Sequence, residues 1–263
     1  MNTAIPYKDL IDMVSFYCDI GVKYIYERAG SSVLLKVNGI TYYSSSIENP
    51  KDRLPVKQIY FIAKVKKHIL KHNLCKKISP NYKNEDLIKY FHYNKKIKVG
   101  ENLKNTYSID IEKAYWVSAL QQGFITNELY QEGLKVDKKI RISCLGTFAK
   151  QKHIYHFNGK NEIYDGCTMP QYPHVFFNQA NAIYGIMEKC RRAIGDKHLF
   201  YWTDGIYVKG KQAAEICEKT IADFGFGYTT TELVNIERSD VGFIVSEYAG
   251  KKLKKKHYKT NTD

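Results

Sequence analysis

Two aspartates in apolar surroundings are the residues of this chain best suited to chemistry. Asp110 lies within residues 107–116, and Asp204 lies within residues 200–208, directly before Gly205. An ionised carboxylate without a partner is costly in such surroundings. Two such aspartates on neighbouring strands could bind two magnesium ions about 4 Å apart, the usual arrangement for in-line phosphoryl transfer. The alternative for Asp204 is an ordinary β-hairpin, because Asp-Gly is a favoured turn pair that needs no chemistry.

The composition indicates a folded and strongly basic protein. The chain has 263 residues, enough for one large domain or two small ones, and 44% of them are hydrophobic. Its net charge of +14 and pI near 9.3 favour a polyanionic partner, most commonly nucleic acid. No long apolar run could span a bilayer, and the first residues lack the pattern of a signal peptide. We therefore expect a cytoplasmic protein with no membrane partner.

The cysteines and histidines do not form a recognisable metal motif. Six cysteines are scattered without C-x-x-C spacing, which favours reduced thiols over a zinc site or disulfides. His68 and His72 lie four residues apart near Cys75, so one helix face could carry both histidines. The surrounding lysines would repel a metal cation, and a solvated basic face is the preferred interpretation.

Hydrophobic spacing organises the N-terminal part. It predicts helices over residues 7–26, 56–74 and 85–93, and a hairpin over residues 32–43 with Asn38-Gly39 as its turn. The lysines of the second helix could contact phosphates or could keep an exposed face soluble, and the sequence does not separate the two. A basic loop at residues 95–100 suggests a boundary, which gives an N-terminal region 1–100 and a second domain 101–263.

Beyond that loop the patterns predict strands alternating with helices. Strands are expected at residues 107–111, 141–148, 153–157, 200–208 (a hairpin), 229–236 and 241–246, and helices at residues 113–122, 174–193 and 211–224. Neighbouring strands come in pairs with helices between them. The prediction is an α+β fold, with an antiparallel sheet covered by helices mainly on one face and a smaller helical and hairpin region at the N-terminus.

Four segments of this chain resemble motifs of family B DNA polymerases, and they follow one another in the same order as in that family. Asp110-Ile111-Glu112-Lys113-Ala114-Tyr115 resembles motif A, D-x-x-S-L-Y-P, with Asp and Tyr in register. Residues 202–208, W-T-D-G-I-Y-V, resemble motif C, D-T-D-S-I-Y-V. The helix after Pro173 resembles the palm helix before motif C, notably in protein-primed phage polymerases. Residues 251–258 are similar to the lysine-tyrosine motif that contacts the primer–template backbone, so the resemblance covers residues 107–260.

The resemblance implies an RRM-like palm and a role for each matching residue. Asp110 and Asp204 would be the catalytic ligands of two magnesium or manganese ions, with the Ile111 carbonyl as a further ligand. Tyr115 would lie beneath the incoming sugar and exclude a 2′-hydroxyl, although a core aromatic is the alternative. Lys113, Arg191 and Arg192 would bind the nucleotide. The expected DNA-binding residues are Lys251, Lys252, Lys254, Lys255, Lys256 and Tyr258.

The sequence also departs from the family. Trp202 stands where motif C has its first aspartate, and Phe177 stands where the fingers lysine is expected. Lys150, Lys152 and Lys160 are therefore further candidates to bind phosphate. The chain is too short for the family's exonuclease and a full thumb, which implies a reduced palm.

Three functions are compatible with these features. The first is a minimal family B-like DNA polymerase or nucleotidyltransferase that serves replication of a phage, plasmid or mobile element. Its partners would be DNA and dNTP, with a priming protein or accessory subunit as further candidates. The second is a catalytically inactive, palm-derived DNA-binding or scaffolding protein. The third is a palm used for other nucleotide chemistry, such as short primer synthesis or protein nucleotidylation.

Overall fold

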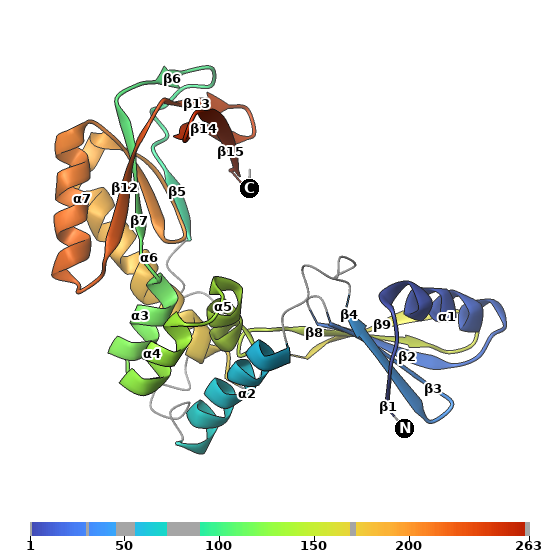
Figure 1. Cartoon of the computed structure of the whole chain (residues 1–263). Helices are drawn as coiled ribbons and strands as arrows, with labels where there is room; N and C mark the ends of the chain where they lie inside the picture. Colours follow the sequence, from blue (N-terminus) through green and yellow to red (C-terminus); the bar gives the residue numbers. More distant parts are fainter. Residues whose placement is uncertain (1, 30–31, 46–55, 73–89, 169–171, 261–263) are drawn as a thin grey trace. The chain divides into compact units, whose positions relative to one another are not determined.

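The chain forms two compact units, each built from two segments. The computed structural model describes residues 2–29, 32–45, 56–72, 90–168 and 172–260. The first unit comprises Met1–Pro80 and Phe124–Phe177, and the second comprises Asn81–Gly123 and Asn178–Asp263 (Figure 1). The sequence placed a single boundary near residue 100, whereas the chain leaves the first unit and later returns to it.

A six-stranded sheet forms the larger part of the first unit. Its order is β1-β4-β3-β2-β8-β9, and all its pairs are antiparallel except β1 with β4. The helix α1 packs on one face through Leu10, against Tyr24, Leu35 and Phe157. The predicted Asn38-Gly39 hairpin is confirmed. The elements are β1 (Asn2–Ala4), α1 (Tyr7–Asp19), β2 (Tyr24–Ala29), β3 (Ser32–Val37), β4 (Ile40–Ser45), β8 (Lys152–Phe157) and β9 (Glu162–Thr168).

Three helices complete the first unit: α2 (Val56–Lys71), α4 (Asn127–Leu134) and α5 (Lys138–Gly146). The predicted strand at residues 141–148 is wrong, because this segment is mostly α5. Asp137 caps that helix by accepting a hydrogen bond from the Lys139 N–H at 2.7 Å. The buried residues Ile140 and Cys144 are four apart, which is helical spacing. No helix within the described residues is long and apolar enough to cross a bilayer.

A five-stranded antiparallel sheet is the centre of the second unit. Its order is β12-β7-β11-β10-β5. The strands are β5 (Phe91–Tyr93), β7 (Thr106–Ile111), β10 (His198–Trp202), β11 (Gly205–Lys209) and β12 (Tyr228–Leu233). The end of the predicted helix 85–93 is thus the strand β5, Tyr90 before it is a bend, and residues 85–89 lie outside the described residues.

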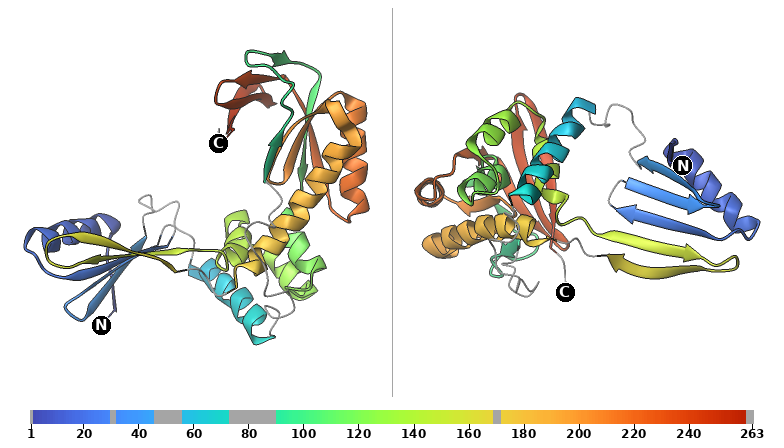
Figure 2. Two further views of the ribbon diagram at one scale, coloured as in Figure 1. Left: turned by 180° about the vertical axis from the view of Figure 1, so that it is seen from behind. Right: turned by 90° about the horizontal axis from the view of Figure 1, so that it is seen from below.

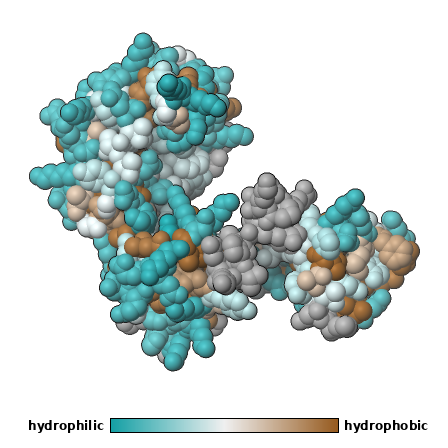
Figure 3. All heavy atoms as spheres, viewed as in Figure 1, coloured by the Kyte–Doolittle hydropathy of each residue, from teal (hydrophilic) through white to brown (hydrophobic). Residues whose placement is uncertain are grey.

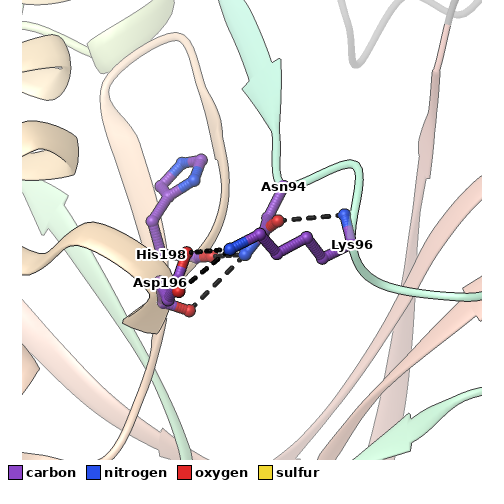
Figure 4. Close-up of polar contacts among 4 residues, drawn as sticks. All are labelled: Asn94, Lys96, Asp196 and His198. Atoms are coloured by element: carbon purple, nitrogen blue, oxygen red, sulfur yellow. Dashed lines mark hydrogen bonds and ion pairs between the residues drawn. The ribbon is translucent and has the colours of Figure 1, made fainter.

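Polar contacts hold the edge strand β5 beside β10. The Asn94 side-chain amide donates to the His198 carbonyl at 3.2 Å, and the Lys96 Nζ lies 2.9 Å from the Asp196 carboxylate (Figure 4). These contacts lie where β10 begins. They fix the strand that carries Phe91 next to the strand that carries Trp202.

Helices cover one face of this sheet. The helices of the second unit are α3 (Ala114–Gln121), α6 (His174–Ile194), of which the part from Asn178 onward belongs to this unit, and α7 (Lys211–Asp223). The last two lie side by side (Figures 1 and 2), and the Cys190 thiol donates to the Cys217 carbonyl at 3.8 Å. The buried residues Ile109, Ile206 and Val208 alternate with residues of the other face. The α+β class with helices on one face of an antiparallel sheet is confirmed.

A second, four-stranded sheet packs on the other face. Its order is β15-β14-β13-β6, with strands β6 (Asn102–Leu103), β13 (Asn235–Ser239), β14 (Gly242–Ala249) and β15 (Lys252–Lys259). Phe200 stacks on Tyr207 and on Phe243, with ring centroids 4.1 and 4.4 Å apart. The lysine-rich segment expected as a basic tail is therefore a paired strand. Gly242 permits this pairing, since a Cβ there would lie 1.8 Å from the Tyr258 carbonyl oxygen.

Candidate carboxylate site

Asp110 and Asp204 come together where β7 ends and β10 turns into β11. Asp110 is paired in register with Gly205, the residue after Asp204. The Ile111 N–H donates to the Asp204 main-chain carbonyl at 2.9 Å. Asp110 thus lies on β7, and Asp204 lies in the turn directly before β11, the strand that pairs with β7; their catalytic role stays a prediction.

Gly205 leaves the space that the Asp110 carboxylate occupies. A Cβ on Gly205 would lie 2.5 Å from Asp110 Oδ1, so a larger residue would displace this oxygen. The predicted hairpin at residues 200–208 is confirmed, but Gly205 is a strand residue paired with Trp202 rather than part of the turn. The two turn residues are Thr203 and Asp204. The glycine therefore serves the carboxylate on the next strand rather than the turn.

Thr203 holds the turn in a conformation that a β-branched residue rarely adopts. Its φ is +51°, in the left-handed region where such residues are outliers. Its N–H donates to the Tyr90 carbonyl at 2.7 Å, and its hydroxyl donates to Asp204 Oδ1 at 2.8 Å. Strained residues of this kind persist where surrounding contacts over-determine them. Here those contacts orient the Asp204 carboxylate.

Trp202 belongs to an aromatic cluster. Its ring centroid lies 5.1 Å from Phe91, 5.6 Å from Tyr90 and 5.8 Å from Tyr258. Register places it in a row across the sheet, with every side chain on the face opposite the helices. The row consists of Thr229, Asp110, Gly205, Trp202 and Phe91.

Two pairs of tyrosines flank the carboxylates. The hydroxyls of Tyr115 and Tyr184 are 3.4 Å apart, and those of Tyr207 and Tyr258 are 2.5 Å apart. Burial is the main cause that raises the pKa of each of these phenols, and the negative charge of Asp204 adds to the rise for the first pair. Asp110 has the same effect on the pKa values of the second pair. All four are neutral at pH 7. Tyr115 thus lies near Asp204, largely buried, a place compatible with either of its predicted roles.

The hairpin of β14 and β15 directs a row of lysines along one face. Lys252, Lys254 and Lys256 alternate on the face that also carries Tyr258, whereas Lys255 projects from the other face and Lys251 lies in the turn. Lys256 pairs with Glu247 at 2.9 Å. This carboxylate is the main cause that raises the Lys256 pKa, and Asp110 contributes too. The face with Tyr258 therefore leads from the carboxylate site along the hairpin.

The predicted phosphate-binding cations of the second unit have carboxylate neighbours. Arg191 and Arg192 lie 2.5 and 2.9 Å from Glu188, whose pKa they lower to about 2. They are about two helical turns beyond Tyr184 on α6, away from the residues near Asp204. Lys113 has a φ of +52°, and its Nζ lies 3.7 Å from Glu112.

The three lysine candidates at residues 150–160 belong to the first unit. Lys152 lies 2.5 Å from the buried Glu27, and Lys150 donates to the Ser32 hydroxyl at 3.2 Å. Lys160 is exposed in the loop after β8. Two of the three thus have contacts within their own unit.

The donor chemistry of the site fits magnesium or manganese. Two carboxylates and the adjoining main chain at Ile111 offer hard oxygen ligands, which these ions prefer. Gly205 keeps the space at Asp110 Oδ1 clear of a side chain. Among the described residues there is no cluster of three or more His, Cys, Asp or Glu side chains that could hold a metal ion. Water and substrate phosphates would have to complete the coordination, as is common for magnesium.

Sequence reasoning missed Thr203, Gly205 and Tyr184 as parts of the site. Tyr184 carries no local motif that would indicate its contact with Tyr115. No protein-family model matches this chain, and a comparison with curated protein sequences finds no match.

Proposed function

We propose that the second unit is a minimal, palm-like nucleotidyltransferase, similar to family B DNA polymerases, that acts in the replication of a phage, plasmid or mobile element. The observation that carries this proposal is the pairing of Asp110 with Gly205 beside Asp204. It places two carboxylates at adjacent strand ends, with a glycine where any side chain would collide with one of them.

The connectivity of the sheet supports an RRM-like palm. Four of its strands and two helices follow in the order β7, α6, β10, β11, α7, β12. In the sheet these four strands have the order β12-β7-β11-β10, so the fourth strand in sequence lies beside the first, and the third lies between the first and the second. This strand-helix-strand-strand-helix-strand plan is that of ferredoxin-like folds. The first and third strands, β7 and β11, are therefore neighbours at the centre of these four strands. Asp110 lies on β7, and Asp204 lies directly before β11.

Each residue of the site has a distinct role in the proposed reaction. Asp110 and Asp204 hold the metal ions, and the Thr203 hydroxyl orients the second carboxylate. When bound, the ions would activate a 3′-hydroxyl and neutralise the leaving pyrophosphate. Lys252 and Lys254 bind the DNA backbone along the hairpin. Tyr115, next to Asp204, contacts the nucleotide sugar.

A DNA-binding protein without catalysis is the second candidate. Trp202 favours it, because an aromatic cluster fills the place of a family carboxylate. The lysine row needs no metal to bind phosphates. The two candidates therefore share a DNA-binding surface and differ in the use of Asp110 and Asp204.

Labelled-nucleotide incorporation on primed DNA with magnesium or manganese tests the proposal. Asp110→Asn and Asp204→Asn remove the negative charge while keeping the side-chain shape, so incorporation should fall by about 1,000-fold or more. Asp223→Asn, at the exposed end of α7, is the matched control and should leave incorporation unchanged. Unchanged turnover in both site variants would refute the two-metal assignment. A parent protein that binds DNA but incorporates nothing would establish the second candidate.

A further inference from the structure

We infer that Trp202, together with Tyr90 and Phe91, forms a stacking surface for a base of single-stranded DNA next to the carboxylates. The inference rests on the proposed binding of DNA by the second unit, and it assigns a function to the residue that departs most from the family pattern. It does not require that the unit be catalytic.

The core beneath Trp202 is complete without this residue. Phe200, Tyr207 and Phe243 form a continuous stack between the two sheets. All three are buried, with at most 4% of their surface exposed. Trp202 lies two residues beyond Phe200 on the same face of β10 and is partly exposed. Trp202 therefore keeps part of its surface exposed at the margin of a core that is filled without it.

Other aromatic residues hold the indole ring of Trp202 in place. Phe91 and Tyr90 lie 5.1 and 5.6 Å from it, and Tyr90 itself is 41% exposed. The Tyr90 carbonyl accepts a hydrogen bond from the Thr203 N–H, which ties this cluster to the turn. The cluster is therefore a preorganised aromatic surface, and such surfaces stack bases without regard to sequence.

The charge next to this aromatic cluster suits a nucleic-acid strand. Tyr258 contacts Trp202 and shares its strand face with Lys256, Lys254 and Lys252. Alternate residues of a strand are about 6.8 Å apart, so the lysines form a regular row of cations that starts at the aromatic cluster. Lysines that contact the backbone, combined with aromatic rings that stack the bases, are the usual means of binding single strands. The face of the molecule drawn in Figure 3 is largely hydrophilic, as expected for a chain with 41 lysine and arginine residues.

Fluorescence gives a direct test, because the chain has only two tryptophans. The other, Trp116, is 2% exposed, and Trp116→Phe makes Trp202 the only indole. Titration with a single-stranded oligo-dT should quench Trp202 emission, with the same midpoint as the anisotropy of a labelled copy of that oligonucleotide. Saturating anisotropy without any change in Trp202 emission would overturn the inference, and so would an absence of binding.

Affinity provides a second readout that does not depend on the Trp116 variant. Trp202→Ala should raise the Kd for single-stranded DNA by about 5- to 100-fold, the range expected for loss of one stacked base, and Trp202→Phe should retain most of the affinity. Phe224→Ala is the control, because it also removes an exposed aromatic ring, one that lies at the end of α7 against Lys189 and does not belong to the Trp202 cluster. Equal affinity of Trp202→Ala and the parent would overturn the inference.

The two proposals fail in different ways. All binding measurements are made without divalent metal, so they do not depend on catalysis. Quenching of Trp202 without nucleotide incorporation would reject the enzyme and keep the stacking surface. Incorporation without quenching would reject the stacking surface and keep the enzyme.

Discussion

The two faces of β15 lead to opposite predictions for DNA binding although they carry the same kind of charge. Lys252 and Lys254 project from the face that carries Tyr258, and Lys255 and Lys259 project from the other face. The double variants Lys252→Gln/Lys254→Gln and Lys255→Gln/Lys259→Gln remove two charges each. Only the first pair should matter to a strand bound along the lysine row. Lys256 is left intact in both variants, because its loss would leave Glu247 without its ion-pair partner.

The expected magnitude follows from counterion release. Each phosphate contact on single-stranded DNA contributes about −0.7 to the slope of log K against log salt concentration. Loss of the two contacts made by Lys252 and Lys254 should therefore reduce the steepness of that slope by about 1.4. Loss of Lys255 and Lys259 should leave the slope unchanged, since neither faces the proposed strand.

Fluorescence anisotropy of a labelled single-stranded oligonucleotide, measured between about 50 and 300 mM salt, gives both slopes. Urea unfolding of each variant checks that the hairpin is intact. If the two double variants lower the slope equally, net charge rather than the face of β15 decides binding, and the assignment of the lysine row is refuted.

Three further perturbations test the geometry of the second unit. Gly205→Ala should reduce nucleotide incorporation as strongly as Asp110→Asn, because the new methyl group would lie 2.5 Å from the carboxylate oxygen; Gly146→Ala, which meets no atom within 4 Å, is the control for a glycine-to-alanine change. Thr203→Gly should relieve the strained φ and stabilise the fold by up to about 1 kcal/mol in urea unfolding, yet slow incorporation, because Asp204 loses its hydroxyl donor; lower stability together with full activity would contradict both parts. Glu188→Gln should destabilise the fold by about 1 kcal/mol near neutral pH, because solvent screens much of this ion pairing, and should flatten the acid dependence of stability. The Glu188 pKa of about 2 lies below its ordinary value of 4.5, so the stabilisation is present above pH 4.5 and is lost as pH falls toward 2; parallel stability–pH curves for variant and parent would contradict this assignment.

The sequence was sufficient where local patterns and long-range pairing agree. The Asn38-Gly39 turn between apolar runs predicted its hairpin, and the spacing of apolar residues predicted α6 and α7. The pairing of β7 with β11 could be anticipated because Asp110 and Asp204 each lie at the end of a short apolar segment, and two such aspartates could share metal ions only on adjacent strands. In each of these segments the local sequence favours one conformation, and the tertiary structure keeps that conformation.

Prediction failed where the decisive contact is distant in sequence. Residues 141–148 contain several apolar residues that suit either a strand or a helix, and the cap at Asp137 decides for the helix. The lysine-rich end has the composition of a solvated tail, but Gly242 lets it pair closely with β14. Neither the need for Gly242 nor the space at Gly205 is visible until the neighbouring strand is known.

Trp202 and Asp204 are positioned by one turn, and this links the two proposals. Thr203 lies between them and is fixed by its N–H to Tyr90 and its hydroxyl to Asp204. A base that stacks on Trp202 would therefore lie beside a carboxylate whose orientation depends on the same strained residue. Under the proposed function, an aspartate at position 202 would add a third carboxylate near the bound metal ions, whereas Trp202 offers a surface for the DNA strand. We propose that this surface holds a strand end next to Asp110 and Asp204, the two carboxylates that would bind the ions.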